Sequence, residues 1–218
     1  AQLSAQIASI LTTPERAEQM AAAAHAQGRP DATIRLAAMV EATVAGLGGL
    51  DILVNNAQEV PNGPLLDVTD EAFMAGFESG PLASFRLMKL AHPHMVARGG
   101  GVIVNLASSA GIRWDMSGYG AYGAVKQATR VLTRAAAAEW GRAGIRVLTI
   151  APHAESPGLK WWVANNPEEA EAFFRTIPLG RIGRLEEDIG RAVAALFADD
   201  GTPIGTVGSG GFGPSVGG

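Results

Sequence analysis

Apolar residues divide the middle of the chain into alternating strands and helices. Three short runs are almost wholly apolar and rich in Val and Ile, at residues 50–56 (LDILVNN), 101–107 (GVIVNLA) and 145–151 (IRVLTIA). Such runs are typical of strands buried on both faces of a parallel sheet. Between them, residues 71–97 and 121–142 carry apolar side chains at helical spacing. This order predicts an α/β fold: a doubly wound parallel sheet between two layers of helices.

Polar and glycine residues set the expected ends of the two helices. Asp70 is placed to cap the first helix, and three glycines at 99–101 close it. Gly144 marks the end of the second helix. These residue types satisfy the free backbone groups of a helix end or tolerate the left-handed backbone that follows it.

The two ends of the chain differ from this middle part. Residues 1–49 carry helical patterns, the last at 31–47, and no hydrophobic strand. Residues 150–180 form a Trp-containing insertion after the third strand, where an open α/β sheet places its ligand cover. Four aromatic residues either line that cover or simply pack together: Trp161, Trp162, Phe173 and Phe174. A last helix is expected at 185–200, before a Gly-rich tail at 201–218 that is a loop or a weak edge strand.

Composition narrows the class of protein. The 218 residues, 47% of them hydrophobic, fit one domain over residues 1–218. The net charge of -4 leaves no basic surplus for a phosphate backbone, so nucleic acid is not an expected partner. No stretch reaches the roughly 18 unbroken apolar residues of a membrane span. The chain has no cysteine, which excludes disulfides and thiolate metal sites. We expect a cytoplasmic protein with no signal peptide, no membrane partner and no metal site.

Tyr122 and Lys126 are the first candidates for chemistry. They lie four residues apart at the start of the second helix, so their side chains share one face. A phenol has a pKa near 10 and is a poor acid or base at neutral pH, but a neighbouring cation stabilises the phenolate. The alternative is a surface pair without a role.

Ser108 lies at the carboxyl end of the second strand, where parallel sheets collect reactive groups. Its hydroxyl could donate a hydrogen bond to a substrate carbonyl oxygen that Tyr122 protonates. Alternatively, Ser108 and Ser109 satisfy backbone groups of the turn after the strand, a common role for serine.

Five motifs make the chain resemble the short-chain dehydrogenases/reductases. They are VNNA (54–57), IVNLASSAG (103–111), YGAVK (122–126), GIRVLTIAP (144–152) and IPLGRIGRLEEDIG (177–190), in the order found in that family. The resemblance covers residues 31–200. It implies a Rossmann-like fold, an NAD- or NADP-dependent oxidoreductase and a small carbonyl or alcohol substrate. It also implies a homo-oligomer, a dimer or tetramer built through the helices at 71–97 and 121–142.

The roles of individual residues follow from the same resemblance. Tyr122 would be the general acid in carbonyl reduction and the base in alcohol oxidation, and Ser108 would orient the substrate oxygen. Lys126 would lower the pKa of Tyr122 and hold the nicotinamide ribose. The residues expected to bind the cofactor are Asn55, Asn56, Ala57, Tyr122, Lys126 and Pro152.

The chain departs from the family pattern at several positions. The Gly-rich phosphate loop, TGxxxGxG after a first strand, is absent, so the N-terminal βαβ unit is interpreted as incomplete. Gln58 and His153 stand where the family has glycine, and Gly80 stands where many members have an asparagine.

Two other functions stay open. Halohydrin dehalogenases resemble this family and lack the phosphate loop, but they carry arginine in place of the lysine that Lys126 provides here. A non-catalytic interaction protein could keep the fold without binding a nucleotide.

Overall fold

The computed structural model describes residues 32–112, 118–155 and 157–197. Three strands, β1 (Ile52–Asn55), β2 (Gly101–Leu106) and β3 (Ile145–Ile150), form a parallel sheet in the order β1-β2-β3. Each strand lies within one of the apolar runs, so the strand positions and the parallel sheet are confirmed.

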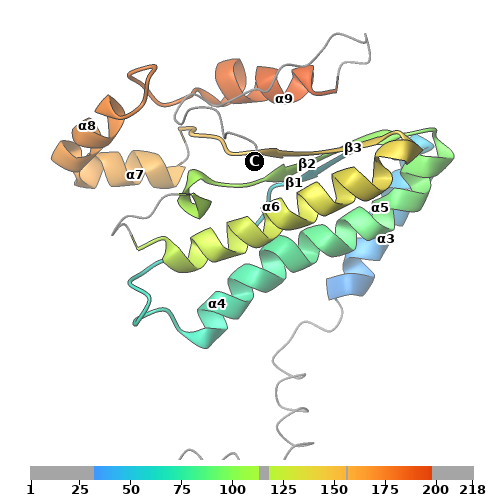
Figure 1. Ribbon diagram of the computed structural model, residues 1–218, viewed down its shortest axis with the longest axis horizontal. Coiled ribbons are helices and arrows are strands. Elements are labelled where there is room, and N and C mark those ends of the chain that lie inside the picture. The colour runs from blue at the N-terminus through green and yellow to red at the C-terminus, as the bar shows by residue number, and fades with distance from the viewer. Residues whose placement is uncertain (1–31, 113–117, 156, 198–218) are drawn as a thin grey trace, which may run out of the picture.

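One layer of helices packs tightly under this sheet. It contains α3 (Ala32–Leu47), α4 (Asp70–Phe77), α5 (Ala83–Ala97) and α6 (Gly120–Trp140), all on the same side of the strands (Figure 1). The core of this layer is built from side chains of the sheet, α3, α5 and α6: Val40, Met88, Ala91, Met95, Ile103, Ala136, Ile145 and Val147.

The opposite face of the sheet carries fewer buried side chains. There α9 (Arg191–Ala195) follows a π-helical turn, Leu185–Gly190 (Figure 1). The adjoining Leu196 packs on Val102 and Val104 of β2. On β1, Ile52 and Val54 have the register of these β2 residues but are 42% and 45% exposed. The expectation that this strand is buried on both faces is therefore wrong for the described residues.

Two further helices lie beyond the carboxyl ends of the strands. They are α7 (Pro157–Asn165) and α8 (Pro167–Arg175), both within the expected insertion (Figure 1). Among the described residues, no helix is long and apolar enough to cross a membrane.

Some helix ends differ from the expectation. Thr69, not Asp70, caps α4, because the Thr69 side chain accepts a hydrogen bond from the Ala72 backbone N–H. The helix expected at 71–97 is interrupted by a π-helical turn at Glu78–Leu82 that contains Pro81. Proline has no N–H to donate, and the wider turn accommodates it. The helical patterns before residue 31 and the tail from 201 lie outside the described residues.

Candidate active site

The expected site residues gather at the carboxyl edge of the sheet. The three strands end there together because they are parallel. Asn55 is the last residue of β1, and the turns after the strands carry Asn56, Ala57, Ser108 and Pro152. Helix α6 begins at Gly120, so Tyr122 and Lys126 lie in its first two turns. The structure thus brings together residues from four separate motifs.

Ser108 is held in a turn against α6. Its backbone is extended, and its Oγ accepts a hydrogen bond from the Ala110 N–H at 3.2 Å. The turn approaches α6 so closely that a Cβ at Gly123 would lie 2.7 Å from the Ala110 carbonyl oxygen. The Gln127 amide also donates to the Gly111 carbonyl. Only glycine at position 123 lets the Ser108 turn and Tyr122 lie side by side.

The Ser108 side chain neighbours the Tyr122 phenol and affects its acidity. Burial raises the pKa of Tyr122 above its ordinary value of 10.0, the Ser108 hydrogen bond lowers it, and Tyr119 raises it further. The net effect is a raised pKa, so the phenol keeps its proton at neutral pH.

Lys126 lies beneath the pair. Its Nζ donates to the Leu106 carbonyl at the end of β2 and lies 5.5 Å from the centroid of the Tyr122 ring. The side chain is 4% exposed, and burial lowers the pKa of Lys126 from 10.5 to about 8. The ammonium is thus directed at the end of β2, and its charge lies close below the Tyr122 ring.

Asn55 is the first of three side chains that are linked by hydrogen bonds. Its Nδ2 donates to Asn105 Oδ1 at 2.7 Å, and Asn105 Nδ2 donates to Thr133 Oγ1 at 2.8 Å. Asn55 Oδ1 is buried and has no hydrogen-bond partner within the described part of the chain. An unpaired buried acceptor costs about 1–3 kcal/mol, so this atom suits a polar ligand lying along the strand ends. Asn56 and Ala57, exposed in the following turn, fit the same ligand.

Sequence reasoning did not single out Asn105 and Thr133, which hold Asn55 in place. Asn105 is the polar residue of an apolar run (GVIVNLA), and it is fully buried. A buried polar residue within a strand is the signal that could have found it, since such groups need hydrogen-bond partners.

Gln58 and Gly80, which both depart from the family pattern, are neighbours in the structure. A Cβ at Gly80 would lie 2.8 Å from Cδ of Gln58 and 3.0 Å from Cγ1 of Val125. The Gln58 side chain therefore occupies the space that a side chain at position 80 would fill. The glutamine at 58 and the glycine at 80 are complementary.

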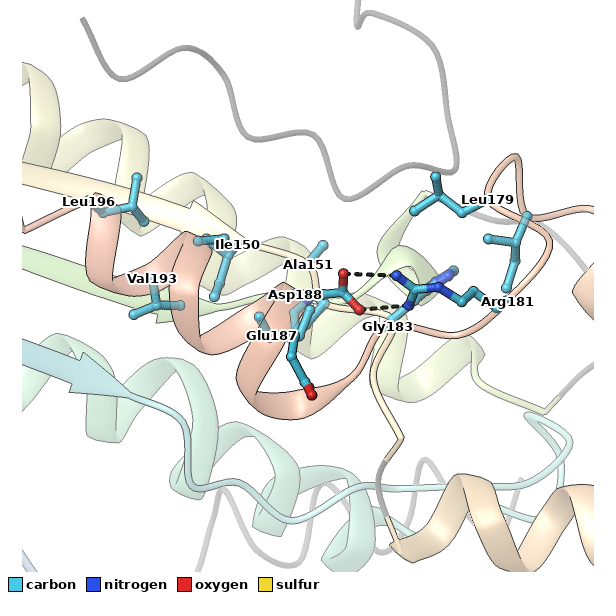
Figure 2. Close-up of a pocket in the computed structure, with 14 residues that line it drawn as sticks. Ile150, Ala151, Leu179, Arg181, Gly183, Glu187, Asp188, Val193 and Leu196 are labelled. Atoms are coloured by element: carbon cyan, nitrogen blue, oxygen red, sulfur yellow. Dashed lines mark hydrogen bonds and ion pairs between the residues drawn. The ribbon is translucent and has the colours of Figure 1, made fainter. Parts of the chain in front are cut away.

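A pocket of about 290 Å³ lies on the α9 side of the same edge (Figure 2). Its wall contains apolar residues of β3, the 177–183 segment and α9, and Arg181 donates to Asp188 there at 2.6 and 3.1 Å. Of the expected site residues, Pro152 lines it, but Ser108, Tyr122 and Lys126 do not. The pocket and the Ser108–Tyr122 pair are therefore neighbouring features that meet near Pro152 and His153.

The aromatic residues of the insertion pack on one another. Phe173 lies edge-on to Trp162, with ring centroids 6.0 Å apart, and 6.1 Å from Phe174. The Trp161 side chain lies outside the described part. No group of three potential metal ligands occurs among the described residues.

The fold and the site define an α/β protein with a candidate acid–base group at the carboxyl edge of its sheet. A family profile described as enoyl-(acyl carrier protein) reductase matches residues 12–206. A 12alpha-hydroxysteroid dehydrogenase from a Clostridium species is 37% identical over 167 residues, which are 76% of this chain and 64% of that protein. The chain thus spans less than two thirds of this relative's length.

Solved structures agree with the sequence matches. A 7-alpha-hydroxysteroid dehydrogenase complexed with NADH and 7-oxo glycochenodeoxycholic acid has a TM-score of 0.70 and 31% identity, covering 78% of this chain and 66% of that one. An NAD+-bound xylitol dehydrogenase has a TM-score of 0.69 and 28% identity, covering 78% and 71%. The chain belongs to the short-chain dehydrogenase/reductase family. This confirms the Rossmann-like fold.

Proposed function

We propose that this protein transfers a hydride between NAD or NADP and a small carbonyl or secondary alcohol substrate, with Tyr122 as the group that gives or takes the proton. The observation that carries the proposal is the grouping of Ser108 and Tyr122 above the buried Lys126, whose Nζ lies 5.5 Å from the centroid of the Tyr122 ring. The relatives named above act as dehydrogenases and support the same reaction class.

Each side chain has a distinct part in carbonyl reduction. Ser108 donates a hydrogen bond to the substrate oxygen and orients it, and Tyr122 gives its proton to that oxygen as the carbonyl becomes an alcohol. The raised pKa of Tyr122 keeps the phenol protonated and ready to donate. The positive charge of Lys126, close below the ring, stabilises the tyrosinate that remains.

The cofactor supplies the hydride when bound. We propose that Asn55, Asn56 and Ala57 bind it along the end of β1, that Lys126 holds its ribose, and that Pro152 borders its nicotinamide end. The unpaired Asn55 Oδ1 supports this placement.

We propose further that residues 1–218 form one domain, with α7 and α8 as its substrate cover. A homo-oligomer, a dimer or tetramer, would form through α4, α5 and α6. Exposed apolar side chains on these helices support it: Met74, Phe85, Val96 and Val131. A monomeric mass in light scattering would contradict the assembly.

The function is tested by titrating the purified chain with NADH and NADPH, followed by fluorescence, in parallel with a Tyr122→Phe variant. Both proteins are expected to bind one of the two cofactors with similar affinity. The variant should lose about 10²–10⁴-fold in the reduction of 7-oxo glycochenodeoxycholic acid or the oxidation of xylitol. No binding of either cofactor at millimolar concentration would overturn the proposal and favour a dehalogenase-like or non-catalytic role.

A further inference from the structure

His153 lies where two loops of the site meet. One loop follows β3 and carries Pro152 and His153, and the other follows β2 and carries Ser108 and Ser109. Pairing of the two strands ends with the Ala107 N–H, which donates to the Ile150 carbonyl at 2.7 Å. Beyond that point, Ser109 Oγ and His153 Nε2 are hydrogen-bonded at 2.7 Å. This side-chain contact extends the connection between the two strands into the turn that carries Ser108.

The backbone at His153 is itself fixed. Its carbonyl accepts a hydrogen bond from the Gly183 N–H at 2.9 Å, and the Glu155 N–H donates to the Gly183 carbonyl at 3.1 Å. These bonds tie the loop to the 177–183 segment that also lines the pocket. The imidazole is thus presented from an anchored backbone, which reduces the entropy lost in forming the bond to Ser109.

The imidazole also contacts the proposed cover. Its ring lies 5.8 Å from that of Phe173 in α8, which in turn packs edge-on against Trp162 in α7. One side chain therefore connects the Ser108 turn with both cover helices.

We propose that His153 is a positioning residue for the reaction: through Ser109 it fixes the turn that aims Ser108 at the substrate oxygen, and through Phe173 it ties that turn to the cover. The proposal rests on the function proposed above. The turn at Ser109–Gly111 is only three residues long, so a hydrogen bond on Ser109 also restrains its neighbour Ser108. A hydroxyl donates and accepts, so the contact suits either imidazole tautomer.

The activity test compares His153→Ala, Ser109→Ala, the double variant and His153→Gln, with NADH or NADPH and 7-oxo glycochenodeoxycholic acid. Each alanine variant is expected to lower kcat about tenfold or more, because small displacements of an orienting group cost up to about 10²-fold. The double variant should lose no more than either single one. Glutamine, whose amide nitrogen reaches about as far as Nε2, should recover most of the activity. KM for the cofactor should stay within twofold.

His92→Ala is the matched control. His92 contacts Trp140, with ring centroids 4.8 Å apart, so this variant also removes a histidine–aromatic contact, but at the far end of α5 and α6. It should leave kcat within twofold. Additive losses in the double variant, or a glutamine variant no better than alanine, would overturn the positioning role.

Hydrogen exchange of the substrate-free protein separates this inference from the proposed function. His153→Ala should speed exchange in residues 107–112, and His92→Ala should not. Unchanged exchange there would overturn the inference even if the wild type turns over the ketone. A wild type without turnover would overturn the proposed function, while the exchange result would still decide whether His153 holds the turn.

Discussion

The two faces of the sheet differ in how completely they are packed. Toward α3, α5 and α6, Ile103 and Ile145 are buried to 0% and 1% exposure among methionine and alanine side chains of the helices. Toward α9, Val102 and Val104 are buried with Leu196, but Ile52 and Val54 of β1 remain nearly half exposed. The packed face carries the elements that hold the proposed acid–base residues. The pocket and the proposed cover belong to the side and end of the sheet where fewer side chains are buried.

This difference in packing matches the proposed role of each side of the sheet. A proton donor needs a fixed position, and α6 gains it from the core beneath the sheet. A pocket must admit and release a substrate, and segments with fewer buried apolar contacts open at a lower free-energy cost. We expect the largest effects on stability from the packed face and the smallest from the pocket side.

Two isoleucines on neighbouring strands test the comparison directly. Ile103→Ala should lower the free energy of unfolding by about 2–5 kcal/mol, because it leaves a cavity in a closed core. Ile52→Ala, the same substitution on the half-exposed face, should cost less than about 1 kcal/mol. Urea unfolding with unchanged m-values measures both. Equal losses would show that the outer face of β1 is covered in solution, and would break the comparison.

Burial of the Lys126 charge on the packed side of the sheet costs free energy of folding. The fall of its pKa from 10.5 to about 8 corresponds to about 3 kcal/mol at roughly 1.4 kcal/mol per pKa unit. Lys126→Met should therefore stabilise the protein at pH 7, by up to about 2 kcal/mol once the unpaired Leu106 carbonyl is counted. The same variant should lose the dehydrogenase activity proposed above.

The pH dependence of the free energy of unfolding provides the control for the Lys126→Met variant. Between pH 8 and 10.5, Lys126 keeps its proton in the unfolded chain and loses it in the folded one, so rising pH stabilises the wild type. The advantage of Lys126→Met should shrink as the pH is raised from 7 to 10. An advantage that does not change with pH would mean that burial of the charge is not its cause.

The sequence predicted the parts of the fold that depend on local pattern. Continuous apolar runs located all three strands, and helical spacing located α3, α5 and α6. The pattern could not show that Ile52 and Val54 would be exposed, because exposure depends on what packs against a strand. It also could not show that Pro81 would open a π-helical turn.

In the site, motif spacing identified Ser108, Tyr122 and Lys126, which the structure places together. The contacts that hold Asn55 and the Ser108 turn in place were not predictable in the same way. Asn105 reaches Thr133 across 28 positions, and Ser109 reaches His153 across 44. Such pairs have no periodicity to reveal them, and they form only when the strands have assembled.

Substitutions at Gly80 and Gln58 test how tightly side chains pack on the α6 side of the sheet. Gly80→Ala should destabilise the protein by about 1–2 kcal/mol, since its Cβ would meet the Gln58 side chain and the fully buried Val125. Adding Gln58→Gly should recover part of that loss. Gly46→Ala in α3, where a Cβ meets nothing within 4 Å, is the control and should be neutral or stabilising. Thermal unfolding of the wild type, Gly80→Ala, the double variant and Gly46→Ala measures these differences, and a Gly80→Ala variant as stable as the wild type would contradict the prediction.

The smallest effect is expected from the charged pair on the pocket side. Hydrogen bonds from Arg181 and from the Arg184 N–H lower the pKa of Asp188 from 3.8 to about 2. The pair therefore adds stability above pH 4, and this contribution is lost as the pH falls toward 2. Because both side chains are in contact with solvent, salt screens the pair and its contribution is small. Arg181→Gln should bring the Asp188 pKa back toward 3.8 in an NMR titration, with little change in stability at pH 7. A large loss of stability would instead show that the pocket side is as firmly packed as the face toward α6.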